Sequence, residues 1–284
     1  MALSFFSKRS NDSEMTFVDH LEQLRWHIVR SLLAIIVCAV IAFIYIDWLY
    51  DNIVLAPLEG NFVTYTALCK LSHWLHVGDT LCLPPAQANL QTTAFGSQFM
   101  ASITFAFVGG FIIAFPYVFW EIWRFIKPAL SPKELKSTRG AIVWVSLFFF
   151  MGVAFGYFLL APFTFSFLSN YTIGTKHLIE AKPTLSDYLE NLMDIIIGSA
   201  IAFQLPVISF VLTRIGLITP AFLKNYRKYA YVFILVVAAV ITPSPDWMSQ
   251  MIVFLPLAML YEFSIVVSGR VFKKEQQRMK DDWE

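Results

Sequence analysis

The stretch FMASITFAFVGGFIIAFPYVFW, residues 99–120, contains no charged side chain from end to end. A helix needs about 20 predominantly apolar residues to cross the roughly 30 Å hydrocarbon core of a bilayer, so this stretch predicts a membrane-spanning helix. Further apolar runs occur on both sides of it. The predicted spans are, in order, Ile28–Trp48, Phe99–Trp120, Ala141–Phe163, Leu192–Leu212, Tyr229–Ile241 and Met251–Val267. We predict an all-α integral membrane protein with six transmembrane helices.

The two C-terminal predicted spans are short. Tyr229–Ile241 would be about 20 Å long at about 1.5 Å per residue, and Met251–Val267 is only slightly longer. Between them lies TPSPDW, residues 242–247. Because proline lacks a backbone N–H and restricts the residue before it, this segment predicts a tight hairpin rather than a continuing helix.

The composition excludes a water-soluble globule. Apolar residues make up 57% of the 284 residues and charged residues 14%, whereas soluble domains carry about 25% charged residues. The sequence contains none of the short motifs of zinc peptidases, serine hydrolases or phosphate-binding loops. Its 5 histidines are not arranged as metal ligands, and a net charge of +1 argues against a nucleic-acid partner. We therefore predict a protein that is not an enzyme and uses no metal or cofactor.

The positions of the basic residues orient the predicted spans. If the spans alternate, all Lys and Arg residues fall on one side except Lys70, Lys176 and Lys182. Cytoplasmic segments of membrane proteins are rich in Lys and Arg, so both termini are predicted to be cytoplasmic. We expect a cytoplasmic tail at 1–15 without a removable signal peptide, a membrane domain at 16–269 with a first periplasmic loop at 51–97, and a cytoplasmic tail at 270–284.

Two of the 3 cysteines, Cys69 and Cys82, lie in the predicted first periplasmic loop. An oxidising compartment allows them to form a disulfide, which would stabilise the fold by about 3 kcal/mol for a loop of this size. Two free thiols are the alternative. Cys38 lies inside the first predicted span, where packing as a small apolar residue is the simplest interpretation.

Acidic residues lie at the predicted cytoplasmic surface, where positive charge is the rule. Apolar residues recur at helical spacing before the first span and predict an amphipathic helix; they are Phe17, Leu21, Leu24 and Ile28. The opposite face is polar and contains Asp19, His20, Glu22, Gln23 and Arg25. A helix that lies on the headgroups would explain the apolar stripe equally well, but it explains the acids less well.

The first predicted cytoplasmic loop and the predicted spans carry further polar residues. Glu134 stands among basic residues of the loop and, taken alone, is a solvated charge. Gln204 lies inside the fourth span, two residues before Pro206. Polar groups at this depth usually face protein or a water-filled cavity, so Gln204 predicts either a contact between helices or a functional site. Glu262 lies near the cytoplasmic end of the sixth span, within reach of the interface.

These residues together resemble the TatC family, the polytopic subunit of the twin-arginine translocase. HLEQLR at 20–25 is similar to the H-L-x-E-L-R motif that precedes the first span in that family. Further similarities follow in order along the chain: APL at 56–58, FIKPALSPKE at 125–134, FQLPV at 203–207, TPSPDWMSQ at 242–250 and LYE at 260–262. The resemblance extends from about Thr16 to Gly269.

The resemblance implies a receptor for signal peptides with two consecutive arginines, which helps to export folded proteins with the proton-motive force. It implies a bacterial cytoplasmic (inner) membrane location and partners of the TatA and TatB types, which have a single span, besides membrane lipid and further copies of the chain. Two guanidinium groups need carboxylates in a fixed geometry, which acids on the cytoplasmic surface would supply. Short spans favour local thinning of the bilayer, which would lower the barrier to a passing folded protein.

The resemblance also implies site residues. Glu134 matches a recognition acid of the family directly. The other recognition acid falls on Gln23, with Glu22 one position earlier and Asp19 one helical turn earlier on the same face. Which of these two acids pairs with an arginine stays open, and Arg25 shapes the same surface.

Four further positions of the family pattern fall within or beyond the membrane. An intramembrane acid of the family falls on Gln204, which does not titrate near neutral pH. We assign Gln204 and Glu262 to partner docking or a polar cavity. Pro57 and Asp246 are assigned to structure on the periplasmic side.

Two other functions fit the sequence less well. A small-solute secondary transporter would need an ionic site at the midplane, where only Gln204 points to one, and the sequence shows no internal repeat. An intramembrane enzyme would need a paired nucleophile or a set of metal ligands, and we find neither in the sequence.

Overall fold

The computed structural model describes residues 17–74, 76, 78, 82–86, 90–126, 140–171, 182–214, 216–242 and 247–281. Within these ranges every named element is a helix, and the one pairing of extended residues is an isolated bridge between Gln91 and Thr184. The predicted all-α class is confirmed.

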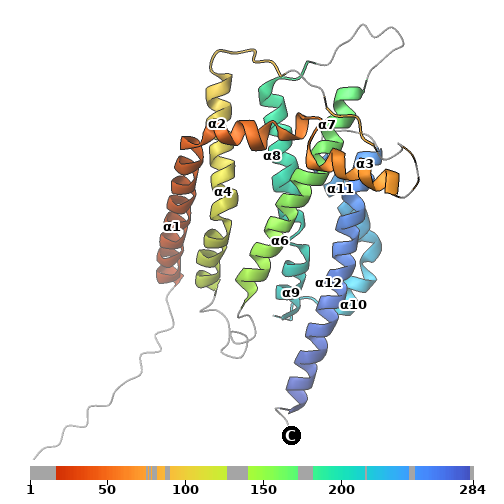
Figure 1. The fold of residues 1–284 in the computed structure, drawn as a ribbon. Coiled ribbons are helices and arrows are strands. Elements are labelled where there is room, and N and C mark those ends of the chain that lie inside the picture. Colours follow the sequence, from red (N-terminus) through yellow and green to blue (C-terminus); the bar gives the residue numbers. More distant parts are fainter. Residues whose placement is uncertain are drawn as a thin grey trace, which may run out of the picture.

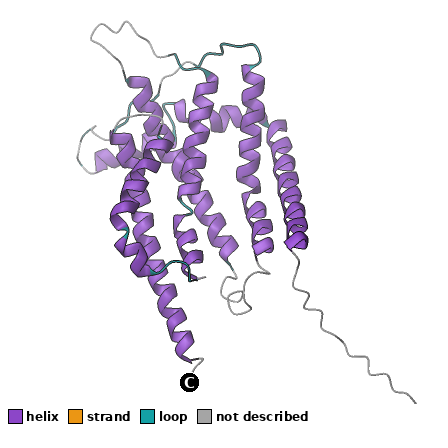
Figure 2. Cartoon of the chain, turned by 180° about the vertical axis from the view of Figure 1, so that it is seen from behind, coloured by secondary structure: helices purple, strands orange, loops and turns teal. Residues whose placement is uncertain are grey.

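The long helices run up and down the molecule and are joined at its two ends (Figures 1 and 2). They are α1 (Phe17–Ile44), α4 (Ser97–Ile126), α6 (Ala141–Phe155), which continues through η4 (Gly156–Leu160) into α7 (Ala161–Asn170), and α8 (Leu185–Ala202), α9 (Leu205–Arg214), α11 (Arg227–Ile241) and α12 (Trp247–Asp281). The short helix α10 (Pro220–Asn225) precedes α11. Short elements between α1 and α4 cross one end of the bundle (Figure 1); they are α2 (Ile46–Leu49), η1 (Tyr50–Val54), η2 (Ala56–Leu58) and α3 (Val63–Trp74).

Five helical stretches have the length and hydropathy to cross a membrane: Glu22–Ile44, Ser97–Ile126, Ile142–Asn170, Leu185–Arg214 and Gln250–Lys273. They correspond to the first four predicted spans and the sixth. The fifth predicted span is α11, which has 15 residues. At about 1.5 Å per residue it is about 22 Å long, shorter than the others, and a total of six spans stays a prediction.

The helix that contains the sixth predicted span is longer than that span. α12 has 35 residues, or about 52 Å of helix at about 1.5 Å per residue. The apolar run ends near Val267, but the following residues include KKEQQRMK at 273–280, which are strong helix formers. The helix therefore continues after the apolar signal has stopped, and in Figure 1 it extends beyond the ends of its neighbours.

The fourth span consists of two helices with a turn between them. α8 ends at Ala202 and α9 begins at Leu205. Pro206 has no N–H to continue the hydrogen-bond ladder of α8, and the N–H of Gln204 bonds instead to the carbonyl of Ile201 at 2.9 Å. This turn directs the side chain of Gln204 toward α6, where its amide nitrogen lies 3.3 Å from the carbonyl oxygen of Val145.

α1 and α4 form one flank of the molecule, and α9, α11 and α12 form the opposite flank (Figures 1 and 2). α1 is the most exposed span, with 6% of its apolar window buried, and α4 is its main neighbour. The two backbones approach closely at Gly110, where an added Cβ would lie 2.5 Å from the backbone nitrogen of Ala39. Small residues at such contacts allow membrane helices to pack tightly.

Two tyrosines, the buried Tyr188 on α8 and the half-buried Tyr157 on η4, form hydrogen bonds to the short elements at the end of the bundle. The hydroxyl of Tyr188 donates to the carbonyl of Val54 at 2.6 Å, and that of Tyr157 donates to the carbonyl of Ile53 at 2.8 Å. Val54 is fully buried in a cluster with Phe165 and Leu192. Burial raises the pKa of the Tyr65 hydroxyl, which also stays a hydrogen-bond donor at this end of the molecule.

Candidate functional site

The first turns of α1 carry four of the five predicted recognition residues. Glu22, Gln23 and Arg25 are exposed. Asp19 lies in α1, but its side chain is outside the described residues, as is all of Glu134 between α4 and α6. The helix end that carries the first group and the end of α4 that leads to Glu134 lie side by side (Figure 1).

A buried carboxylate joins α1 to α4 near these ends. The side chain of Glu121 is 1% exposed. Its Oε2 lies 2.5 Å from Nδ1 of His27, its Oε1 accepts a hydrogen bond from the hydroxyl of Tyr117 at 3.1 Å, and Oε1 also lies 3.7 Å from Nη1 of Arg124. We call these four residues the α1–α4 clamp.

The chemistry of the α1–α4 clamp fixes its donors and acceptors. An ionised carboxylate can only accept, so Nδ1 of His27 donates to Glu121 and the Tyr117 hydroxyl donates to the second oxygen. A buried charge is costly unless it is paired and hydrogen-bonded. Separation of α1 from α4 would leave this carboxylate without its partner on the other helix, so the clamp opposes that movement.

Neither Glu121 nor His27 was predicted as a site residue, although their positions relative to the predicted spans indicate a contact. His27 directly precedes the first predicted span, and Glu121 directly follows the second. Consecutive spans run in opposite directions, so these two positions belong to the same end of the bundle. An acid and a histidine at matching ends of consecutive spans are candidates for an ion pair.

A hollow lies beside the α1–α4 clamp, between the same two helices. Its volume is about 230 Å³, and its walls are largely apolar. Besides His27, it is lined by Leu24, Ile28, Ser31, Val118, Ile122 and Phe125. An apolar hollow of this size near the exposed acid Glu22 could receive one apolar side chain of a bound peptide.

Glu262 joins α12 to α11. Its Oε2 lies 2.6 Å from Nη2 of Arg227, and its Oε1 accepts from the hydroxyl of Tyr231 at 2.6 Å. Both members of the ion pair are more than a third exposed. This carboxylate is therefore accessible at the outer face of the two last helices, unlike that of Glu121.

Gln204 contacts backbone rather than a charged group. Its amide nitrogen is directed to the carbonyl oxygens of Val145 on α6 and Ala200 on α8, at 3.3 Å and 3.5 Å. It is half-buried. This geometry matches the predicted contact between helices more closely than a polar site open to ligands.

Of the two predicted periplasmic residues, Pro57 lies in the short elements at the other end. Pro57 is buried in η2, and its carbonyl accepts from the hydroxyl of Tyr65 at 3.0 Å. Asp246 is outside the described residues. Cys69 and Cys82 form a disulfide, which leaves Cys38 as the free cysteine.

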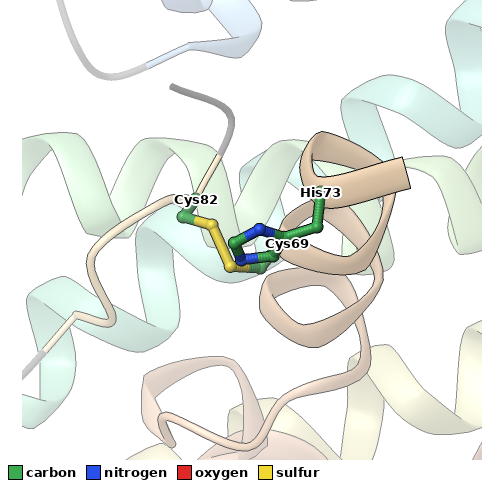
Figure 3. A group of neighbouring side chains, drawn as sticks. All are labelled: Cys69, His73 and Cys82. Carbon is green, nitrogen blue, oxygen red and sulfur yellow. A yellow bond between two sulfur atoms is a disulfide. The ribbon is translucent and has the colours of Figure 1, made fainter. Parts of the chain in front are cut away.

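His73 lies beside this disulfide (Figure 3). One nitrogen of His73 and the two sulfur atoms lie within 4.8 Å of one another, a set that could hold a metal ion. From the sequence, no metal ligand was predicted among the histidines. The spacing of Cys69 and His73, four residues apart on one helix, is the signal that could have revealed the set.

Comparison with known proteins gives one consistent result. Residues 19–256 match the family model described as Sec-independent protein translocase protein (TatC). The chain is 38% identical to a Sec-independent protein translocase protein TatC of Blattabacterium sp. subsp. Periplaneta americana (strain BPLAN), over 94% of this chain and 100% of that protein. It is 32% identical to the protein of the same name from Halalkalibacterium halodurans, over 95% of each.

Solved structures show the same similarity in three dimensions. Two crystal structures described as the twin arginine translocase receptor TatC superpose with TM-scores of 0.64 and 0.68. Each is 27% identical to this chain and covers 88% of it, and the chain covers 97% and 99% of their lengths.

Proposed function

Because this chain belongs to the TatC family, we propose that it is the signal-peptide receptor and a core component of a twin-arginine translocase. It recognises signal peptides with consecutive arginines at the cytoplasmic face and supports export of folded proteins driven by the proton-motive force. The observation that carries this proposal is the juxtaposition of α1 and α4 by the α1–α4 clamp, on a fold shared with solved TatC receptors.

The recognition chemistry of the proposal rests on carboxylates at the adjoining ends of α1 and α4. Glu134 holds one guanidinium group, and Glu22 or Asp19 holds the other, each through paired N–H···O bonds that lysine cannot reproduce. Gln23 and Arg25 shape the exposed surface between them. The apolar hollow beside His27 receives an apolar side chain of the peptide.

The proposed topology has six spans in a bacterial cytoplasmic (inner) membrane, with both termini in the cytoplasm. Residues 1–15 and 270–284 are cytoplasmic tails, 16–269 form the membrane domain, and 51–97 form the first periplasmic loop. The distribution of Lys and Arg supports this orientation. α11 is the fifth span in this proposal, and its short length favours a locally thinned bilayer.

Fusions to alkaline phosphatase, which is active only outside the cytoplasm, test α11 as a span. A fusion after Thr242 is expected to be active, and a fusion after Arg214 is expected to be inactive. A fusion after Asn170 is the positive control, because it lies beyond the third span. An inactive fusion after Thr242 would contradict the six-span topology.

The partners proposed for the chain are single-span subunits of the TatA and TatB types, together with further copies of the chain and lipid. Glu262 is the best placed docking residue among those described, because its carboxylate is exposed at the outer face of α11 and α12. Gln204 contributes less, since its amide contacts the carbonyls of neighbouring helices. The same contacts favour a role for Gln204 between helices over a role in a small-solute site.

Binding of a fluorescent twin-arginine signal peptide to the purified protein tests the function. The wild type is expected to bind this peptide at least about tenfold more tightly than a twin-lysine version, since each lost bidentate contact costs about 1.5–3 kcal/mol. Glu134→Ala is expected to lower affinity for the arginine peptide and leave affinity for the lysine peptide nearly unchanged.

Glu59→Ala is the matched control for this experiment. Glu59 is exposed, but it lies next to η2 at the opposite end of the molecule, so its loss is expected to have no effect. Equal affinity of the wild type for the two peptides would overturn the receptor assignment. An unchanged preference in Glu134→Ala would overturn the role of that residue alone.

A further inference from the structure

The group formed by Cys69, His73 and Cys82 lies at the end of the molecule opposite the proposed receptor surface (Figures 1 and 3). Cys69 and His73 come from consecutive turns of α3, and Cys82 comes from the segment that returns along it. The two cysteines are half-buried and His73 is exposed. Solvent therefore reaches the group from the side of the imidazole.

The positions of these residues do not depend on the S–S bond alone. The hydroxyl of Ser166 on α7 donates to the carbonyl of Pro84 at 2.6 Å, and Ala86 is fully buried in the adjoining core cluster. At the other end of the connection, the hydroxyl of Ser72 donates to the carbonyl of Gly78. We expect these contacts to keep the segment that carries Cys82 near α3 when the two sulfur atoms are no longer bonded.

Two thiolates and one imidazole are ligands that suit zinc. Zn²⁺ is bound by Cys sulfur and His nitrogen in tetrahedral sites, and sites with three protein ligands keep the fourth position for water. Thiolate ligands also favour such soft or borderline ions over Mg²⁺ and Ca²⁺. We propose that the reduced chain binds Zn²⁺ through Cys69, His73 and Cys82, at a site that the disulfide closes in the oxidised chain.

The two states exchange through a balanced reaction. A dithiol reductant transfers two electrons to the Cys69–Cys82 bond and is itself oxidised to a disulfide, so that the protein gains two thiol protons. Zn²⁺ then displaces these two protons as it binds the thiolates. Either the disulfide or the ion connects α3 to the segment 82–86, so the connection survives a change of redox state.

Spectroscopic titration with Co²⁺, which replaces Zn²⁺ in thiolate sites, tests the proposal. The full chain in detergent is reduced with a dithiol, freed of the reductant without oxygen and titrated. The reduced wild type is expected to bind one Co²⁺ with an intense thiolate-to-metal charge-transfer band, which Zn²⁺ abolishes by displacement. The oxidised wild type and Cys69→Ser/Cys82→Ser are expected to show no such band.

Two histidine variants distinguish a site with three protein ligands from weak metal binding by the two thiols alone. His73→Asn is expected to weaken binding by about tenfold or more, and His76→Asn is expected to have no effect. His76 is a matched control because it is exposed, lies three residues away and is outside the group. Its φ of 56° is a conformation that asparagine tolerates. Equal binding by the two variants would overturn the assignment of His73.

Thermal melting provides a second test, which remains informative if reduction destabilises the protein. Zn²⁺ is expected to raise the melting temperature of the reduced chain and not of the oxidised chain, because an ion that binds only the folded state stabilises it. Absence of the charge-transfer band, or a reduced chain that Zn²⁺ does not stabilise, would overturn the proposal. The receptor assignment would be unaffected, because it rests on the opposite end of the molecule.

Discussion

Glu121→Ala is expected to destabilise the protein by about 1–3 kcal/mol, the effect of leaving a buried hydrogen-bond donor without its acceptor. The substitution leaves His27 without the carboxylate that lies 2.5 Å away and leaves the Tyr117 hydroxyl without its acceptor. Because these contacts hold the ends of α1 and α4 together, we also expect a weaker preference for twin-arginine over twin-lysine peptides. Melting in detergent and peptide binding measure the two effects.

Glu262→Ala is the control that separates the effect of burial from the effect of losing a glutamate. It also removes a glutamate bonded to an arginine and a tyrosine, but this ion pair is more than a third exposed. Exposed pairs contribute about 0–1 kcal/mol, so a small change in stability is expected. If the two alanine variants melt at the same temperature, the α1–α4 clamp has no special role in stability.

His27→Leu/Glu121→Leu tests whether an unpaired charge causes the loss. Replacing both members of a buried pair by apolar residues of similar volume is often neutral or stabilising, and the neighbouring hollow is already apolar. The double variant is therefore expected to recover most of the stability that either single leucine variant loses. A double variant as unstable as the sum of the singles would show that the two side chains do not interact.

The spans could be predicted from the sequence because their signal is local. An apolar run long enough to cross a bilayer has few other interpretations in a chain with 14% charged residues. The same signal could not predict the full length of α12, because hydropathy indicates where an apolar run ends and not where the helix ends. The turn at Gln204 was not predicted, because the missing N–H of Pro206 can either kink a helix or end it.

The α1–α4 clamp and the Cys69–His73–Cys82 group escaped prediction for a different reason. Each depends on which elements lie side by side, and the two partners of the clamp are 94 residues apart. Single residues such as Glu121 or His73 have unremarkable surroundings in the sequence. The predicted recognition residues Glu22, Gln23 and Arg25 were found through a motif, which gives their identity but not the helix that faces them.

Gly110→Ala is expected to destabilise the protein by about 1–3 kcal/mol, the usual effect of overpacking a tight contact. The added Cβ would lie 2.5 Å, 2.7 Å and 2.9 Å from the backbone nitrogen, Cα and Cβ of Ala39. These are not the flexible ends of long side chains, so α1 must move away from α4. The movement would strain the α1–α4 clamp, and we expect the preference for twin-arginine peptides to fall.

Gly109→Ala provides the control at the adjacent position. No atom lies within 4 Å of a Cβ added there, and alanine favours a helix over glycine by about 1 kcal/mol, so this variant is expected to be neutral or slightly more stable.

Spin labels at the exposed positions Val37 and Phe107, introduced as cysteines in a Cys38→Ser background, would report the distance between α1 and α4. A longer distance in Gly110→Ala alone would connect the close helix contact to recognition. If that distance and the peptide preference both stay at their wild-type values, α1 can adapt at Ala39 without moving its recognition end, and the spacing of the two helices does not determine selectivity.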